Sequence, residues 1–229
     1  MVGEKTLARF SLSGVVIVGV GGVGAYAAEM LARAGIGRIV AVDSDCVSLS
    51  NKNRQLLALD STVGDSKVDV LERRLLDINP SIQIVKIKEY ITEENVASVF
   101  DSMQFDFLVD AIDTLSPKLA LIEYCVKRGL HFVSSMGSGA KYDVTKIRIA
   151  DLSKSRNCPL AHIVRKKLRK RGISGGFPVV YSEELPDNGA FVLEESTNKK
   201  SQVGTISYLP AAFGCACAQS AVSYLRGNE

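Results

Sequence analysis

The sequence predicts an α/β fold: a Rossmann-like, doubly wound sheet that is mostly parallel, with a mixed and elaborated C-terminal third. Short β-branched runs alternate with segments of helical periodicity as far as residue 139, and a glycine-rich turn joins the first run to the first helix. The 229 residues are 46% hydrophobic, enough for the core of one domain. We therefore expect one domain over residues 1–229, divided into a core (1–139) and an elaboration (140–229).

Five strands and four helices are expected in the core. The strands fall at residues 15–20, 38–43, 82–87, 105–112 and 131–135. The helices fall at 23–34, 68–78 and 116–128, with a short one through Phe100 that Thr92 caps. Right-handed crossovers between parallel strands place all their carboxyl ends at one edge of the sheet, where ligands bind in such folds.

The alternation changes after Gly139. Residues 146–150 have the pattern of an edge strand, 159–171 that of a helix, and 174–189 the Gly, Pro and acid content of an exposed loop. Residues 203–225 are apolar but interrupted by Pro210 and Gln219, so we expect a buried strand-to-helix segment and no integral membrane span. No signal peptide is expected, and the N-terminus is expected to lead directly into the first strand.

Charge and cysteine content restrict the class of protein. The 28 basic and 25 acidic residues give a net charge of +3, so any nucleic-acid surface must be local. The five cysteines form no Cys-x-x-Cys pair, so no zinc is expected, and their odd number indicates a reduced, cytoplasmic protein.

The strongest local signal is the turn Gly19-Val20-Gly21-Gly22-Val23-Gly24. Its glycines allow a tight turn and let backbone N–H groups approach a phosphate at the positive end of the next helix. Asp43 ends the second strand, where an acid accepts the ribose hydroxyls of a nucleotide. Turn and acid together fit NAD, FAD or ATP equally well; the alternative is a structural turn with a capping acid.

The segment after Asp43 favours ATP. It contains Asn51, Arg54 and Lys67, cationic and amide groups that a hydride-transfer enzyme has no need to gather beside the phosphates. Nucleotidyl transfer does need fixed cations, because negative charge builds on the phosphoryl oxygens and on the departing pyrophosphate. Arg54 offers a bidentate fork, and Lys67, near a helix start, offers a point charge.

Six motifs occur in a fixed order along the chain. They are Gly-x-Gly-Gly-x-Gly from Gly19, Asp43-Ser44-Asp45, Ser50-Asn51-x-x-Arg54-Gln55, Gly64-x-x-Lys67, Ile78-Asn79-Pro80 and Asp110-Ala111-Ile112-Asp113. With them the sequence resembles the ubiquitin-activating-like (ThiF, MoeB and HesA) adenylating enzymes over nearly its whole length. The resemblance implies that residues 1–229 form a single adenylating domain whose residues 1–139 bind the nucleotide.

The same resemblance implies roles for the site residues. Asp43 would be the ribose ligand, Asn51, Arg54 and Lys67 would bind the phosphates of ATP, and Asp45 would also belong to the nucleotide site. Asp113 would hold Mg²⁺, which suits a carboxylate at a strand's carboxyl end, although such a residue is also typical of a turn or helix cap. Arg54, Lys67 and Asp113 would then be the catalytic residues.

Within this family the sequence is most similar to the tRNA threonylcarbamoyladenosine dehydratases. The shared features are Arg38, Asn51-x-Asn53-Arg54-Gln55, Asp113-Thr114-x-x-Pro117-Lys118, Met136 to Ala140, Lys146-Ile147, Asp151 to Lys154, Cys158-Pro159-Leu160 and, approximately, Gly204-Thr205 through Pro210. This resemblance implies that ATP activates the carboxylate of a threonylcarbamoyl group on tRNA adenosine. The neighbouring ureido nitrogen would then displace the activated oxygen, giving a cyclic base with net loss of water.

Two other functions stay open. One is adenylation of the C-terminal glycine of a ubiquitin-like sulfur-carrier protein; the other is a nucleotide-bound, non-enzymatic scaffold for sulfur-transfer partners. The resemblance also implies a homodimer and allows a sulfur-transfer protein as partner. An arginine that members of the family carry before the first strand would fall before Met1, and Arg9 is too close to Val15 to replace it.

Two further groups of residues have alternative explanations. The basic run from Arg165 to Arg171 fits either contact with tRNA phosphates or favourable charge at a helix C-terminus. Cys215 and Cys217 are expected in the core rather than in a redox pair, and Cys125 is expected to pack in the core. Cys158, before Pro159 in an expected loop, is the most reactive thiol predicted.

Overall fold

A seven-stranded sheet forms the centre of the protein in this computed structural model, which describes residues 3–192 and 202–227. Its strands are β1 (Gly14–Val18), β2 (Arg38–Val42), β3 (Gln83–Ile87), β4 (Phe107–Asp110), β5 (Phe132–Ser135), β6 (Ile147–Asp151) and β7 (Pro178–Ser182). They lie in the order β3-β2-β1-β4-β5-β7-β6; only β6 is antiparallel to its neighbour. The predicted doubly wound, mostly parallel sheet is confirmed.

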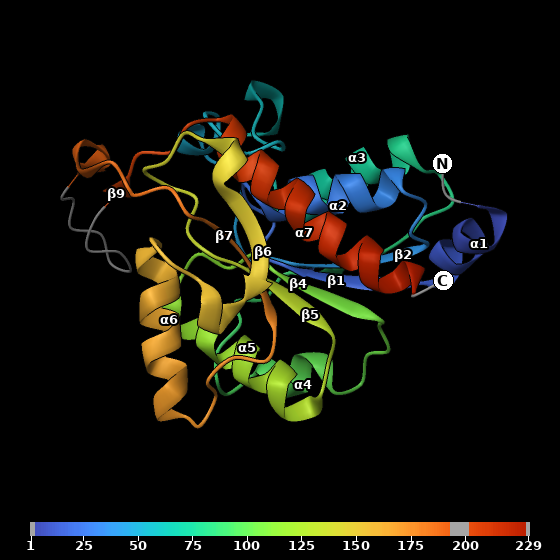
Figure 1. The fold of residues 1–229 in the computed structure, drawn as a ribbon. Coiled ribbons are helices and arrows are strands. Elements are labelled where there is room, and N and C mark those ends of the chain that lie inside the picture. The colour runs from blue at the N-terminus through green and yellow to red at the C-terminus, as the bar shows by residue number, and fades with distance from the viewer. Residues whose placement is uncertain (1–2, 193–201, 228–229) are drawn as a thin grey trace.

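Helices cover both faces of the sheet (Figure 1). On one face lie α1 (Glu4–Leu12), α2 (Gly24–Arg33), α3 (Lys67–Ile78) and α7 (Tyr208–Arg226), and on the other α4 (Val96–Phe100), α5 (Leu115–Arg128) and α6 (Pro159–Lys170). Val15 and Ile17 of β1 pack in the first layer's core, Val16 and Val18 in the second's. Burial on both sides explains why this strand is continuously apolar rather than alternating.

The short elements lie mainly in the connections. They are the 3-10 helices η1 (Leu49–Asn51), η2 (Asp60–Thr62), η3 (Val144–Lys146), η4 (Leu152–Lys154) and η5 (Asn188–Ala190), and the antiparallel pair β8 (Phe191–Val192) and β9 (Gln202–Val203). The expected stop at Gly129 is confirmed, because this glycine takes the left-handed conformation (φ +64°) directly after α5.

Helix α7 returns to the start of the chain. Its Gly214 lies so close to α2 that a Cβ there would come within 2.5 Å of the Val23 carbonyl oxygen. The close approach brings the first turn of α7 beside the glycine turn, where the Pro210 side chain would be 3.2 Å from a Cβ on Gly22. The apolar C-terminal segment is therefore part of the core, and among the described residues no helix is long and apolar enough to cross a bilayer.

Two local expectations were wrong. Residues 174–189 are not all loop: β7 lies inside them, with Val179 and Val180 fully buried between β5 and β6. The five residues of this strand were not predicted, because the surrounding Gly, Pro and acidic residues are typical of an exposed loop. The chain does not enter β1 directly, because α1 precedes it. Thr92 caps the turn that leads into α4: its Oγ1 accepts from the Asn95 N–H (3.3 Å), and Asn95, directly before α4, accepts from the Thr92 N–H through Oδ1 (2.7 Å).

Candidate active site

The glycine turn lies at the carboxyl edge of the sheet, between β1 and α2. Gly19 has φ +88°, and a Cβ there would be 2.8 Å from the Ala111 carbonyl oxygen; a Cβ on Gly24 would be 1.8 Å from that of Gly19. Only glycine fits these two positions. The N–H groups of Gly21 and Gly22 make no hydrogen bond with any residue of the described ranges. They therefore offer donors at the positive end of α2, a suitable place for phosphate.

Asp43 follows β2 and is fixed against this turn. Its Oδ2 accepts a hydrogen bond from the Val20 N–H (2.6 Å) and its Oδ1 one from the Asp45 N–H (2.8 Å). Burial raises the pKa of the Asp43 carboxyl, while the nearby Lys67 ammonium and these two N–H donors act in the opposite direction. Asp43 follows the second strand as expected and its carboxylate lies beside the turn; its ribose-binding role stays a prediction.

Lys67 is held beside the two aspartates. It is the first residue of α3, and its side chain is 7% exposed, with Nζ 2.7 Å from Asp45 Oδ2 and 3.9 Å from Asp43 Oδ1. A β-bridge between Cys46 and Ser66 joins the two segments, and the Lys67 N–H donates to the Asp45 carbonyl (3.0 Å). This brings the Lys67 ammonium group next to Asp45, 22 residues away in sequence, and close to the Asp43 carboxylate.

Arg54 packs against the glycine turn at Gly22. A Cβ on Gly22 would lie 3.5 Å from Arg54 Cγ. Its Nη1 donates to the Ser50 carbonyl (3.1 Å) and to Asn53 Oδ1 (2.8 Å), which orients the guanidinium. Asn51 lies in η1 with its Oδ1 accepting from the Ser48 N–H (3.1 Å), so the amide also shapes the loop that carries Arg54.

Asp113 is exposed, three residues beyond the end of β4, in a loop that touches the glycine turn through Ala111. The loop is fixed by Asp110, whose Oδ1 accepts from the Ile112 N–H (3.0 Å). Among the described residues no group of three or more His, Cys, Asp or Glu residues could hold a metal. Since Mg²⁺ commonly uses one or two carboxylates together with phosphates and water, a lone aspartate is compatible with it.

Sequence reasoning missed the group that holds Asp110. The Nζ of Lys118 is 2.6 Å from Asp110 Oδ2 and 3.2 Å from Ser134 Oγ, and Ser134 Oγ donates to the same carboxylate oxygen (2.5 Å). All three residues are fully buried. Lys118 was noticed only as part of a motif, because lysine is rarely expected in a core.

The C-terminal segment connects the Arg54 loop to the loop after β5. Asn53 Nδ2 donates to the Thr205 carbonyl (3.3 Å), and the Ala140 N–H donates to the Gly204 carbonyl (2.8 Å). A Cβ on Gly139 would be 2.7 Å from Val203 Cγ1. The Gly204 to Pro210 stretch therefore lies along the site, next to the glycine turn.

Comparison with known proteins agrees with this arrangement. The ThiF family model matches residues 1–229. The chain belongs to the ThiF family. The resemblance stated from the sequence is thereby confirmed.

Several relatives of this ThiF-family chain carry the same enzyme name. A tRNA threonylcarbamoyladenosine dehydratase of Bacillus subtilis is 45% identical over 199 residues, covering 87% of this chain and 76% of that protein. Dehydratase 2 of Saccharomyces cerevisiae is 40% identical over 91% of this chain, which spans 47% of that protein. The crystal structure of the Escherichia coli enzyme with ATP superposes with a TM-score of 0.89 at 33% identity, covering 97% of this chain and 89% of that one.

Residues outside the site clarify the remaining predictions for this ThiF-family protein. Cys125 packs in the core as expected, and Cys217 is buried, but Cys215 is exposed because it lies on the opposite side of α7. Cys158 is buried, not an exposed loop thiol, because it immediately precedes α6 and packs into its core. Arg9 donates to the Arg226 carbonyl (2.7 Å), so it joins α1 to the end of α7.

Proposed function

We propose that this protein is an ATP-dependent tRNA threonylcarbamoyladenosine dehydratase. The observation that carries the proposal is an arrangement of charged side chains around the glycine turn, made by Asp43, Lys67 and Arg54. This arrangement suits a nucleoside triphosphate. Relatives that carry this enzyme name align with most of the chain, and the Escherichia coli enzyme has been crystallised with ATP and with AMP.

The residues fit ATP in a defined way. The glycine turn (Gly19, Gly21, Gly22 and Gly24) would receive the phosphates through backbone N–H groups. Asp43, with Asp45 beside it, would accept the ribose hydroxyls, and Lys67, Arg54 and Asn51 would contact the phosphates. Asp113 would hold Mg²⁺, which neutralises phosphate charge when bound.

The chemistry has two steps. A carboxylate oxygen of the threonylcarbamoyl group attacks the α-phosphorus of ATP, and the bond to pyrophosphate breaks. The ureido nitrogen then attacks the activated carbonyl carbon, loses its proton, and AMP leaves with the carboxylate oxygen, so that the base is lighter by one water. Arg54 and Lys67 stabilise the charge that develops on the phosphoryl oxygens in the first step.

Several further features complete the proposal. Residues 1–139 form the nucleotide-binding core of a single adenylating domain, and 140–229 its elaboration. The enzyme acts in the cytoplasm as a homodimer, and a sulfur-transfer protein is a possible partner. The single domain is supported by the seven-stranded sheet, to which both segments contribute strands. A tRNA substrate is supported by the names of the relatives.

The decisive experiment measures AMP release with purified tRNA that carries or lacks the threonylcarbamoyl group, followed by nucleoside mass spectrometry. We expect AMP only with the modified tRNA, and a product lighter by one water. AMP formation with a ubiquitin-like carrier protein, and none with tRNA, would assign the site to that carrier instead. ATP binding without any turnover would assign the protein to the scaffold class.

A matched variant tests the assigned residues. Arg54→Ala should keep the fold, because the side chain lies at the surface of the site, but should lose about 100-fold or more of the AMP-forming rate by analogy with loss of one charge-stabilising donor. Full activity of Arg54→Ala, with unchanged thermal unfolding, would refute the phosphate contact while leaving the dehydratase proposal open to the tRNA experiment.

A further inference from the structure

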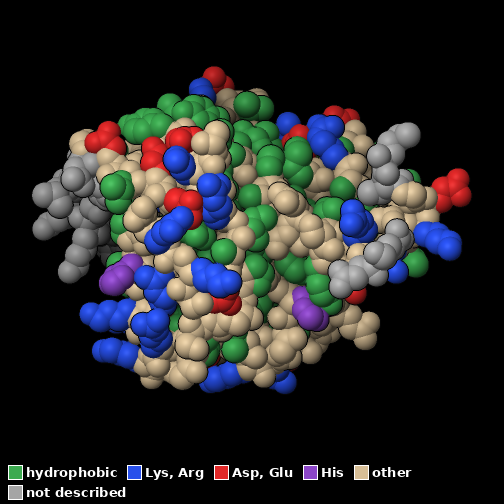
Figure 2. Space-filling model, in the orientation of Figure 1, with side chains coloured by type: hydrophobic (Ala, Val, Ile, Leu, Met, Phe, Trp, Pro, Cys, Tyr) green, Lys and Arg blue, Asp and Glu red, His purple; other side chains and the backbone are tan. Residues whose placement is uncertain are grey.

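Positive charge is concentrated in one part of the chain. Residues 141–171 contain eleven Lys and Arg and only two acids, a net charge of +9, whereas the other 198 residues contain 17 basic and 23 acidic residues, a net charge of −6. Figure 2 shows Lys and Arg side chains gathered over α6 and the adjoining part of β6. A nearly neutral protein thus carries a cluster of basic side chains on the face formed by α6.

Part of the basic run in α6 has a structural role. Arg165 donates through Nη1 to the Ser155 carbonyl and to Ser155 Oγ, both at 2.6 Å, which fastens η4 to α6. Arg171 pairs with Glu123 of α5 and with Glu93. The contacts of these two arginines within the fold are sufficient to give both a structural role.

The remaining four cations have no such explanation. Lys166, Lys167, Arg169 and Lys170 are exposed, and none forms an ion pair with another residue in the ranges 3–192 and 202–227. Lys166 and Lys170 are four residues apart, and Lys167 and Lys170 three, so the like charges repel along the helix. Favourable interaction with the helix dipole is limited to the last turn, so it does not account for the whole group.

The shape of α6 favours a nucleic-acid partner over a membrane. Ala161, Val164 and Leu168 are fully buried in the layer that packs under β5 and β7. The helix therefore has its apolar stripe in the core, whereas a helix that binds a membrane surface needs that stripe for the lipid. A rigid row of exposed cations is instead typical of a surface that contacts a phosphate backbone.

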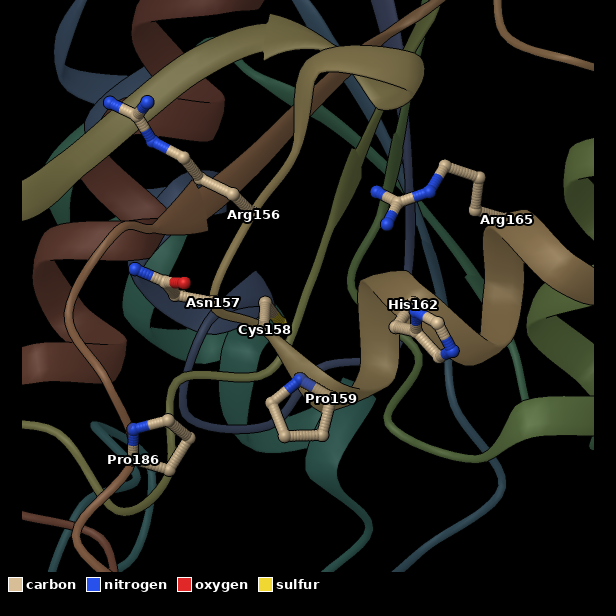
Figure 3. Close-up of a pocket in the computed structure, with 7 residues that line it drawn as sticks. All are labelled: Arg156, Asn157, Cys158, Pro159, His162, Arg165 and Pro186. Atoms are coloured by element: carbon tan, nitrogen blue, oxygen red, sulfur yellow. The ribbon is translucent and has the colours of Figure 1, made fainter.

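The basic surface begins beside the candidate active site. Cys158, immediately before α6, has its Sγ 3.9 Å from the Gly137 carbonyl, in the loop that leaves the carboxyl edge of the sheet. At this end of α6 lies a hollow of about 290 Å³ with Arg156, His162 and Arg165 on its wall (Figure 3); Arg156 forms an ion pair with Glu183, which is not among the lining residues. From there α6 leads away from the edge that carries the glycine turn.

We propose that Lys166, Lys167, Arg169 and Lys170 of α6, together with the hollow at its first turn, form the surface that binds the phosphate backbone of the tRNA substrate. This proposal rests on the proposed function for the identity of the RNA. The surface holds the body of the tRNA while the modified adenosine reaches the carboxyl edge of the sheet. It supplies affinity through charge, and it makes no contact with ATP.

The test uses the full chain with Lys166→Gln, Lys167→Gln and Lys170→Gln combined. Glutamine has nearly the helix propensity of lysine, so α6 should persist. We expect the tRNA dissociation constant to rise about 10- to 100-fold at moderate salt, and the slope of log affinity against log salt concentration to fall by about one per lysine removed. ATP affinity should not change, and the KM for tRNA should rise more than kcat falls.

Two control variants distinguish this role from a general effect of charge. The combined variant Lys166→Arg, Lys167→Arg and Lys170→Arg should retain its affinity for tRNA, because the positive charges are kept. Lys5→Gln, Arg33→Gln and Lys88→Gln combined remove three exposed cations from α1, α2 and the segment after β3, and should leave tRNA affinity nearly unchanged. Equal loss in this second variant would overturn the proposal.

The surface proposal and the dehydratase proposal can fail separately. If the α6 variant binds tRNA with wild-type affinity and salt dependence, the surface proposal is wrong even when the wild type forms the dehydrated product. If the wild type binds unmodified tRNA through α6 but never releases AMP, the surface stands and the proposed function fails. Loss of binding to anionic phospholipid vesicles, with tRNA binding intact, would assign α6 to a membrane and also overturn the proposal.

Discussion

Two aspartate–lysine pairs flank β1 at the carboxyl edge of the sheet, and they differ in accessibility. Asp43 follows β2 and meets Lys67 at the start of α3 with 3.9 Å between Oδ1 and Nζ; their side chains are 10% and 7% exposed. Asp110 ends β4 and meets Lys118 of α5 at 2.6 Å, and both are completely buried. In the first pair Lys67 also contacts Asp45, which is largely exposed.

The difference separates a binding role from a structural one. Lys67 reaches a partner at the surface, so its ammonium can exchange Asp45 for a phosphate. Lys118 is sealed by Asp110 and Ser134, and its charge can only hold the loop that runs to Asp113. The same pair of residue types, each at a strand end and the following helix, is thus accessible on one side of β1, where we propose ligand binding, and sealed on the other, where it positions a loop.

The largest effect should come from breaking the sealed pair. Lys118→Met leaves Asp110 as an uncompensated buried charge, so the free energy of unfolding should fall by about 3–5 kcal/mol. Urea unfolding followed by circular dichroism measures it. The double variant Asp110→Leu with Lys118→Met should be more stable than Lys118→Met alone, because no buried charge remains; a more severe loss in the double variant would contradict this interpretation.

The accessible pair should respond in activity rather than stability. Lys67→Gln removes the point charge beside the phosphates, so the AMP-forming rate should fall by about 100- to 1000-fold. The unfolding free energy of Lys67→Gln should change far less than that of Lys118→Met, since Asp45 is largely exposed and stays hydrated without its lysine partner. Rapid-quench measurement of AMP tests the rate, and thermal unfolding is the control for stability. A Lys67→Gln variant with much lower stability but an unchanged AMP-forming rate would reverse the roles of the two pairs.

A smaller effect is expected for Asp43→Asn. The amide keeps one acceptor oxygen but loses the charge, and a hydrogen bond to a charged group contributes about 1.5–3 kcal/mol. We therefore expect ATP affinity to fall by roughly 10- to 100-fold, measured by calorimetry, while AMP affinity falls in parallel because both carry the ribose. Loss of ATP affinity with AMP affinity unchanged would show that Asp43 acts on the terminal phosphates instead.

The smallest effect concerns pH. Burial raises the pKa of Asp43 above the usual 3.8, so this carboxyl gains a proton at a higher pH than an exposed aspartate. ATP affinity should therefore weaken as pH falls towards the raised pKa, whereas the contribution of Asp43 to folding changes in the opposite direction, because ionisation of a buried acid opposes folding. The ratio of wild-type to Asp43→Asn affinity, which cancels titration of ATP itself, should decrease at low pH.

Local sequence was sufficient for the parts of the site that lie in continuous segments. The glycine turn, Asp43 and the start of α3 at Lys67 follow from residue types and spacing, because each depends on neighbours within one strand–turn–helix unit. It was insufficient where the contact is long-range: the link from Asn53 to Thr205 joins residues 152 apart. Hydrophobic periodicity within a helix or strand cannot predict a contact between residues so far apart in sequence.

The sequence by itself determined the doubly wound architecture, the glycine turn and the acid beside it, since these arise from hydrophobic periodicity and backbone sterics. Only the tertiary structure decided that β7 lies between β5 and β6, and that Arg165 belongs to the fold while Lys166 and Lys170 belong to the surface. It also decided that Lys118 is buried with Asp110. Burial depends on which elements pack together, and chain-local patterns do not specify the partner.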